Sequence, residues 1–220
     1  MKYDVSFSVD FKRNTYPGRF IVLEGIDGSG KTTQAKSLAE QLNKKGQKTV
    51  YTAEPTDGPI GQLIHKILKG QIKVAKASFQ HLFSADRANH EEEIVRSLRN
   101  GVNVVCDRYF WSAVAYGILD THEERDYYLT ALSILSFYNR FLAPDVTFYL
   151  KVSVGEALRR LSHMHKEKEI YEKKEKLEKI SAGYEWLLQK FPKEFIVVDG
   201  EKPVEEVTKD IVRRIKNNES

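Results

Sequence analysis

The stretch EGIDGSGKTTQ, residues 24–34, follows directly on the apolar run FIVL, residues 20–23, and is the strongest indication of the fold. Residues 25–32 fit the pattern GxxxxGKS/T of a phosphate-binding loop, with a strand-like run before it and a helical pattern after it. Glycines let backbone N–H groups turn inward around phosphate oxygens, and the positive end of the following helix faces the same anion. The stretch therefore predicts a P-loop.

Each part of this loop has an expected role toward a bound nucleotide. Lys31 neutralises the β- and γ-phosphates, and Thr32 offers its hydroxyl to Mg²⁺. Thr33 has an alternative role in packing or capping the helix. The residues expected to bind ATP are Gly25, Asp27, Gly28, Ser29, Gly30, Lys31, Thr32 and Thr33. P-loops occur in switches, motors, transporters and small-molecule kinases, and the sequence holds no NKxD motif of a GTPase switch.

Length and composition narrow the class of protein further. The 220 residues suit one domain, and no apolar run is long enough to span a bilayer. The single cysteine cannot form an internal disulfide, so we expect a cytoplasmic protein without a membrane partner. The 35 basic residues are nearly balanced by 31 acidic ones, which argues against nucleic acid as a partner and is compatible with small phosphorylated ligands.

Short β-rich runs alternate with longer helical patterns along the chain. The expected strands are residues 20–24, 48–52, 102–106, 145–150 and 194–198, and the expected helices include 31–45, 77–99 and 203–217. This alternation predicts an α/β fold in which a five-stranded parallel sheet lies between two layers of helices. We therefore expect one three-layer αβα P-loop domain over residues 19–220.

Two segments depart from this regular pattern. In residues 3–11 apolar and polar side chains alternate, which is the period of a half-buried strand and predicts an extra strand in an extension of residues 1–18. Residues 162–179 are nearly all charged, which is typical of a solvated helix surface.

Four ordered motifs make the sequence resemble the thymidylate kinases, which transfer the γ-phosphate of ATP to dTMP. The family patterns EGxDGxGKTTQ, EPxxxPxG, LFxADRxxH and DRYxxSxxAY are matched by residues 24–34, 54–61, 82–90 and 107–116. The resemblance implies a nucleoside monophosphate kinase that uses ATP and Mg²⁺ and forms a homodimer. The apolar segment 129–138 is a candidate face for that dimer, with burial inside the monomer as its alternative.

The third motif carries side chains suited to a pyrimidine. Phe83 and Arg87 lie four residues apart, so on a helix they share one face and offer a ring to stack on a base and a guanidinium to bind its carbonyl. The alternative places Phe83 in the core and Arg87 in an ion pair with Asp86 or Glu91. The resemblance implies base binding, and it adds Glu54 of the second motif to the substrate site.

The fourth motif comes directly off an expected strand, at the carboxyl end where open α/β sheets bind ligands. Arg108 is suited to clamp the acceptor phosphate there, and Asp107 to organise Mg²⁺ or its waters; a local Asp-Arg ion pair is the alternative. The resemblance implies that Arg108 holds the phosphate of dTMP and that Asp27 takes the 3′-hydroxyl. It also places Tyr116 under the deoxyribose, where it excludes a 2′-hydroxyl, and Ser112 near the base.

The reaction needs no nucleophilic side chain, because an oxygen of the acceptor phosphate attacks. Catalysis then rests on alignment and on positive charge near the transferred phosphoryl group. Some thymidylate kinases carry an arginine in the P-loop where this chain has Gly28. The resemblance therefore implies that a mobile lid near residues 153–175 supplies the charge through Arg159 and Arg160.

Two positions differ from many members of the family. Ala53 stands where an arginine often precedes the EP pair, and Gly117 stands where a glutamine often follows the AY pair. These differences leave a kinase for another pyrimidine monophosphate, such as dUMP, as an alternative to a dTMP kinase. The lid segment also holds fewer arginines than is typical of the family, which leaves a second alternative, a nucleotide-binding protein without turnover.

Overall fold

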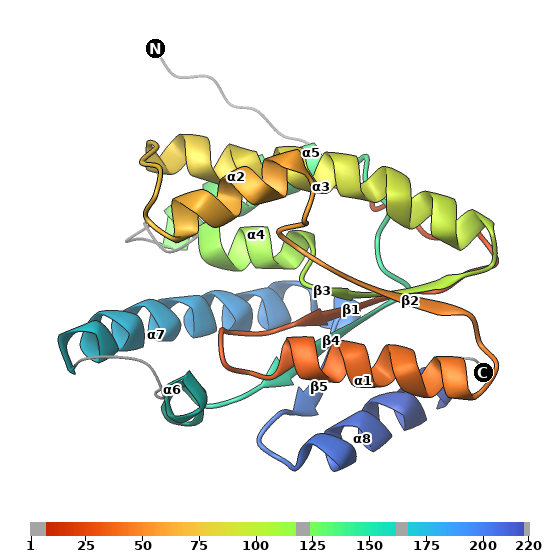
Figure 1. The fold of residues 1–220 in the computed structure, drawn as a ribbon. Coiled ribbons are helices and arrows are strands. Elements are labelled where there is room, and N and C mark those ends of the chain that lie inside the picture. Colours follow the sequence, from red (N-terminus) through yellow and green to blue (C-terminus); the bar gives the residue numbers. More distant parts are fainter. Residues whose placement is uncertain (1–7, 118–123, 162–166, 218–220) are drawn as a thin grey trace.

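A five-stranded parallel sheet forms the centre of the computed structural model, which describes residues 8–117, 124–161 and 167–217 (Figure 1). The elements are β1 (Phe20–Glu24), α1 (Lys31–Lys44), β2 (Thr49–Ala53), α2 (Pro59–Leu68), α3 (Lys76–Arg99), β3 (Asn103–Asp107), α4 (Phe110–Gly117), α5 (Glu124–Tyr138), β4 (Val146–Lys151), α6 (Val154–Leu161), α7 (Glu167–Lys190), the 3₁₀ turn η3 (Pro192–Glu194), β5 (Ile196–Asp199) and α8 (Val204–Asn217). The predicted fold class is confirmed, and each strand begins within about two residues of its predicted start.

The strand order is β2-β3-β1-β4-β5. After β1 the chain passes through α1 to β2 on one side, whereas after β3 it returns across β1 to β4 on the other side. The connections thus diverge between the neighbouring strands β1 and β3. In an open parallel sheet, ligands bind outside the carboxyl ends of the strands at such a point. The P-loop follows β1 and the Asp-Arg-Tyr segment follows β3, so the topology brings these two motifs together.

Two hydrophobic cores lie on the two faces of the sheet. Alternate residues of β1 point to opposite faces, with Phe20 and Val22 in one core and Ile21 and Leu23 in the other. The first core includes buried residues of α3, α4, α5 and α7, and the second includes those of α1 and α8. All five residues of β1 are buried because helices cover both faces, and this holds the start of the P-loop rigidly.

The helix ends follow the punctuation in the sequence. Gly46 and Gly101, just after α1 and α3, have φ values of 79° and 70°, left-handed conformations that glycine adopts without strain. Pro59 occupies the first turn of α2, where its missing N–H costs nothing. No described helix is both long and apolar enough to cross a membrane.

The N-terminal strand predicted over residues 3–11 is not found in the part of it that the structure describes. Residues 1–7 lie outside the described part, and residues 8–11 form no strand; a single bridge joins Lys12 to Leu142. The ring of Phe11 instead stacks on Phe110 at 5.5 Å and contacts Trp111 at 5.6 Å. The alternating apolar side chains that suggested a strand therefore serve, at Phe11, to pack the extension onto the core.

Candidate active site

The P-loop turns sharply from β1 into α1. Gly28 and Gly30 have φ values of 83° and 89°, which only glycine adopts readily, and Gly30 precedes the first residue of α1. The buried Nζ of Lys31 donates to the carbonyl oxygen of Ile26 at 2.8 Å. Burial, followed by repulsion from Arg108, lowers the pKa of Lys31 to about 7. The loop thus holds a buried amine against its own backbone.

A hydroxyl and a carboxylate meet beside this loop. Thr32 on α1 donates a hydrogen bond to the Oδ2 atom of Asp107, the last residue of β3. The Oδ1 atom of Asp107 is buried and has no hydrogen-bond partner among the described residues. Burying a carboxylate oxygen without a partner is unfavourable, so this atom is free to take a cation or its water.

Arg108 joins the P-loop to the segment after β3. Its guanidinium forms an ion pair with Asp27 and donates to the carbonyl oxygen of Gly25 at 3.1 Å. The hydroxyl of Tyr116 donates to the same Asp27 oxygen at 3.0 Å, and the guanidinium carbon lies 5.1 Å from the centre of the Tyr116 ring. Burial alone would raise the pKa of Asp27, but Arg108 first, and then Lys31 and Tyr116, outweigh it and lower the pKa.

A second buried cluster surrounds Arg87 of α3. The Nε atom of Arg87 donates to Glu54 at 2.6 Å and the Nη1 atom to the hydroxyl of Tyr138 at 2.5 Å. The Nδ1 atom of His90 lies 3.0 Å from the other oxygen of Glu54. Burial lowers the pKa of Arg87, but attraction to Glu54 and the tyrosines outweighs it, so the net shift is upward. Arg87 is therefore a fixed cation at physiological pH.

The ion pairs considered for Arg87 from the sequence alone, with Asp86 or Glu91, are both wrong. Asp86 accepts from the N–H and the hydroxyl of Thr56 at 2.8 and 2.7 Å, and Glu91 accepts from the N–H of Leu142 at 2.6 Å. Phe83 lies one turn before Arg87 on α3; it is half-buried, and its ring contacts that of Phe79 at 4.9 Å. The two predicted base-binding side chains thus lie near each other on one helix.

Helix α6 lies against the P-loop. A Cβ atom built on Gly28 would come within 2.6 Å of the carbonyl oxygen of Ala157, so no side chain fits there. The Nη1 atom of Arg160 lies 3.4 Å from the carbonyl oxygen of Ser29. Arg159 points to solvent, with 72% of its side chain exposed, and pairs with Glu156. The structure therefore brings one of the two predicted lid arginines to the loop. Residues 162–166 of the predicted lid lie outside the described part.

A sequence profile described as thymidylate kinase matches residues 23–211, which is most of the chain. The chain belongs to the thymidylate kinase family. A probable thymidylate kinase from Methanococcus aeolicus is 41% identical over 203 residues, covering 90% of this chain and 95% of the relative. A probable thymidylate kinase from Pyrococcus horikoshii is 40% identical over 209 residues, covering 91% and 97%. The predicted family, and with it an ATP-dependent nucleoside monophosphate kinase, is confirmed.

A solved structure agrees with this thymidylate kinase fold. The thymidylate kinase of Candida albicans superposes with a TM-score of 0.76 at 26% identity and covers 94% of both chains. That structure has been described as revealing the origin of broad substrate specificity and a novel structural element. The likeness therefore extends over the whole architecture and is not limited to the P-loop.

The structure gives partners to Ser112 and also to several side chains for which the sequence predicted no role. Ser112, which the resemblance placed near the base, is buried, and its hydroxyl bonds to Glu24 at 2.5 Å and lies 3.0 Å from that of Tyr184. His90 and Tyr138 hold Glu54 and Arg87, as described above. A signal for His90 existed, because it lies three residues after Arg87 on the same helix. Tyr184 and Tyr138 come from distant helices, and no local pattern marks them.

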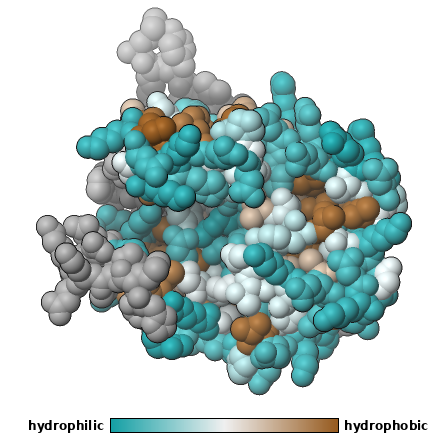
Figure 2. Space-filling view, viewed as in Figure 1, coloured by the Kyte–Doolittle hydropathy of each residue, from teal (hydrophilic) through white to brown (hydrophobic). Residues whose placement is uncertain are grey.

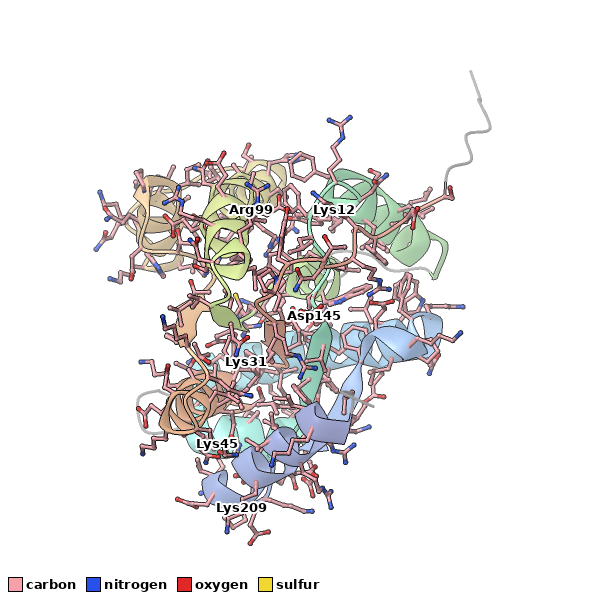
Figure 3. All side chains as sticks on the ribbon, turned by 90° about the vertical axis from the view of Figure 1, so that its right-hand side faces the viewer. Lys12, Lys31, Lys45, Arg99, Asp145 and Lys209 are labelled. Atoms are coloured by element: carbon pink, nitrogen blue, oxygen red, sulfur yellow. The ribbon has the colours of Figure 1, made fainter. Side chains whose placement is uncertain are left out.

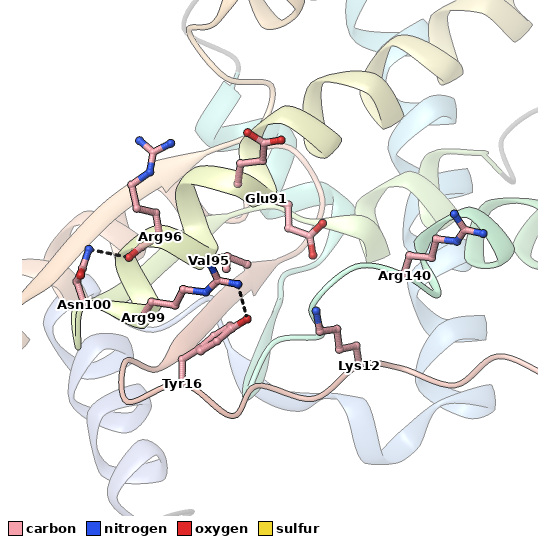
Figure 4. A pocket seen from close by; sticks show the side chains of 9 residues that line it. Lys12, Tyr16, Glu91, Val95, Arg96, Arg99, Asn100 and Arg140 are labelled. Atoms are coloured by element: carbon pink, nitrogen blue, oxygen red, sulfur yellow. Dashed lines mark hydrogen bonds between the residues drawn. The ribbon is translucent and has the colours of Figure 1, made fainter.

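A separate hollow of about 480 Å³ lies at the other end of the sheet (Figure 4). Tyr16 and Arg99, which line it, precede the starts of β1 and β3, whereas the P-loop follows the end of β1. Lys12 and Arg99 lie close together in Figure 3, away from Lys31. The hollow mixes four cations with Glu91 and Glu92, and none of the predicted nucleotide-binding residues lines it.

Proposed function

We propose that this enzyme transfers the γ-phosphoryl group of ATP to dTMP, giving ADP and dTDP. The observation that carries the proposal is the ion pair of Arg108 with Asp27. It connects Arg108, a cation suited to the acceptor phosphate, with the P-loop, which is suited to the phosphates of ATP. The family supports it, because its relatives are described as thymidylate kinases. The phosphoryl donor and the phosphoryl acceptor would thus each have a group suited to bind them, the P-loop and Arg108.

In this mechanism an oxygen of the acceptor phosphate forms a bond to the γ-phosphorus, and the bond from that phosphorus to the β–γ bridging oxygen breaks. Arg108 orients the acceptor phosphate, and Lys31 and Arg160 place positive charge beside the phosphates of ATP. Positively charged side chains that are already held in position in a partly buried site stabilise the charge on the transferred group without reorganisation. The side chains form no covalent bond with the substrate.

Mg²⁺ fits the pair formed by Thr32 and Asp107. A hydroxyl and a carboxylate are the hard oxygen ligands that Mg²⁺ takes from proteins, together with waters and substrate phosphates. The buried, unpartnered oxygen of Asp107 supports this assignment. When bound, the ion would neutralise charge on the phosphates of ATP.

The acceptor nucleoside is proposed to lie between α3 and α4. Phe83 stacks on the base, Arg87 binds a base carbonyl, and Glu54 holds Arg87 in place, since both are buried and form an ion pair. Asp27 takes the 3′-hydroxyl and Tyr116 lies under the sugar; the hydrogen bond between them keeps both side chains in one orientation. Ser112 is assigned to Arg108 rather than to the base, because its hydroxyl accepts from Arg108 at 3.2 Å.

The experiment that tests the proposal is the Arg108→Ala substitution. We expect kcat/KM for dTMP to fall by about 10³-fold, the scale of removing a preorganised charge contact from a transition state. Arg96→Ala, which removes an exposed arginine in the separate hollow, serves as the control and should keep wild-type kinetics. Equal kinetics of Arg108→Ala and the control would remove Arg108 from the acceptor site.

A second candidate function is phosphorylation of another pyrimidine monophosphate such as dUMP. A Cβ atom on Gly117 would lie 2.6 Å from Ile134, so the glutamine often found there in the family would not fit unless Ile134 moved. In this enzyme the edge of the base would therefore be contacted by other groups than in family members that carry this glutamine. The Candida albicans enzyme is itself described as having broad substrate specificity.

We also propose that the enzyme is a homodimer that uses the outer face of α5. Leu135 and Tyr138 on this helix are buried, while Leu129 and Phe137 are 57% and 50% exposed. A separate group of hydrophobic residues reaches the surface at the top of the view in Figure 2, where α2, a different helix from α5, lies in Figure 1. Light scattering should give twice the chain mass, and Phe137→Glu should give the mass of one chain. A wild-type mass of one chain would refute the dimer.

A further inference from the structure

Arg108 holds a backbone conformation that needs support. Its φ of 73° is left-handed, and among the described residues no other non-glycine residue has a positive φ. A side chain at Cβ makes this conformation unfavourable, so it persists only where surrounding contacts fix it. The residue proposed to bind the acceptor phosphate thus depends on whatever holds the turn between β3 and α4.

Glu24, the last residue of β1, holds that turn. Its Oε1 atom accepts the N–H of Tyr109 at 3.0 Å and the N–H of Ser112 at 3.1 Å. These groups belong to the residue after Arg108 and to the first turn of α4, whose N–H groups have no partner within the helix. A carboxylate there also lies at the positive end of the helix. Glu24 therefore caps α4 from a neighbouring strand.

The other oxygen of Glu24 acts on the side chain of Arg108. Its Oε2 atom accepts the hydroxyl of Ser112 at 2.5 Å, and the oxygen of that hydroxyl accepts the Nη1 group of Arg108 at 3.2 Å. A hydroxyl that donates to a carboxylate must turn its lone pairs outward, toward the guanidinium. Tyr184 of α7 donates to the same Oε2 atom at 2.8 Å, which fixes the carboxylate from the far side.

We propose that Glu24 is the positioning residue of the acceptor-binding arginine, fixing both the left-handed backbone and the guanidinium of Arg108. The proposal rests on the proposed function of Arg108. Glu24 is fully buried, and among the described residues its carboxylate forms hydrogen bonds with the turn after Arg108, with Ser112 and with Tyr184. It forms none with a P-loop side chain, although Glu24 directly precedes Gly25 and its charge raises the pKa of Lys31. Its effect should therefore fall mainly on the acceptor nucleotide.

The test is the Glu24→Gln substitution, which keeps the shape and one oxygen for the two N–H groups but turns an acceptor of two hydroxyls into a donor. We expect KM for dTMP to rise by about tenfold, the scale of one misoriented charge-assisted contact, while KM for ATP stays within about twofold. Glu91→Gln is the matched control, because Glu91 also accepts one backbone N–H but lies outside the site. It should change neither KM.

A double-mutant cycle separates positioning from general stability. If Glu24 acts through Arg108, Glu24→Gln should cause no further loss of kcat/KM in the Arg108→Ala background. Independent, multiplying losses would overturn the proposal, and so would equal increases in KM for both nucleotides. If Glu24→Gln does not fold, Ser112→Ala replaces it: KM for dTMP should still rise by about threefold, and an unchanged value would overturn the orienting link. Wild-type kinetics of Arg108→Ala would instead reject the proposed function.

Discussion

Lys31 is a buried amine that lies near a second cation, Arg108. Its titration should therefore make the free energy of unfolding depend on pH, which a solvent-exposed lysine would not do. Its pKa in the folded protein is about 7, whereas an unfolded lysine titrates near pH 10.4. Between these values the unfolded chain binds more protons than the folded one. Because of Lys31, the free energy of unfolding should therefore increase as the pH rises from about 7 to about 10, and this increase is absent below pH 7.

Replacing Lys31 by the uncharged Met should remove this dependence. The free energy of unfolding of Lys31→Met minus that of the wild type should be larger at pH 6 than at pH 9. We expect the two differences to be about 1–3 kcal/mol apart, after allowing for relaxation around a buried charge. Urea denaturation of both proteins at the two pH values, without nucleotide, measures the difference. The same difference at both pH values would mean that Lys31 keeps an ordinary pKa in the folded protein.

At the scale of single residues, motif spacing predicted which side chains meet but not how each is held. Asp27, Arg108 and Tyr116 come from separate motifs, and they form one hydrogen-bonded group. The partner of Arg87 was missed, because Glu54 directly follows β2 and reaches Arg87 only once α3 packs over the sheet. Ion pairs between distant segments leave no periodicity in the sequence.

Among the elements, the contact of the P-loop with α6 makes Gly28 hard to replace. Gly28→Ala meets both a left-handed φ of 83° and the carbonyl oxygen of Ala157 at 2.6 Å. Gly46→Ala is a matched control, because its φ is 79° but nothing lies within 4 Å of the added carbon. We expect Gly46→Ala to cost about 1 kcal/mol of stability, and Gly28→Ala to cost more and to raise KM for ATP. Equal thermal stabilities and ATP kinetics of the two variants would contradict this contact.

The two arginines of α6 should differ in their effect on turnover. Arg160 lies beside Ser29 of the P-loop, whereas Arg159 is exposed and bound to Glu156, whose pKa these arginines lower to about 2. Arg160→Ala should therefore lower kcat by about 10²-fold, and Arg159→Ala by far less, in steady-state assays with saturating nucleotides. Arg213→Ala breaks a similar exposed pair on α8 and serves as the control. A larger loss for Arg159→Ala would place the charge on the other side of α6.

Strands and long helices were predictable because their burial is written into the sequence pattern. Central parallel strands are continuous apolar runs, and glycines mark the ends of α1 and α3. The N-terminal extension was harder, because alternation at residues 3–11 fits either a strand or a segment lying on the core. The described residues 8–11 take the second arrangement, since the aromatic rings of Phe110 and Trp111 offer a surface to Phe11.

For the whole molecule, topology explains why the functional groups lie at one end of the sheet. The chain direction diverges between β1 and β3, and the groups proposed for ATP and for the acceptor phosphate follow those two strands. The strand order therefore brings together the two groups that a kinase needs, which the order of the motifs had indicated. The identity of the acceptor base depends on finer features, chiefly Phe83, Arg87 and the space around Gly117, where small changes decide specificity.

The most direct test is ADP formation from ATP and Mg²⁺ with dTMP, dUMP, UMP, CMP and dCMP measured side by side. A pocket fitted to thymine should favour dTMP over dUMP by at least about tenfold in kcat/KM, the discrimination that one methyl group provides. Ribonucleotides should be poorer still if Tyr116 excludes the 2′-hydroxyl. A higher kcat/KM for another acceptor would contradict the proposed substrate, and no turnover with any of the five would contradict the proposed function itself.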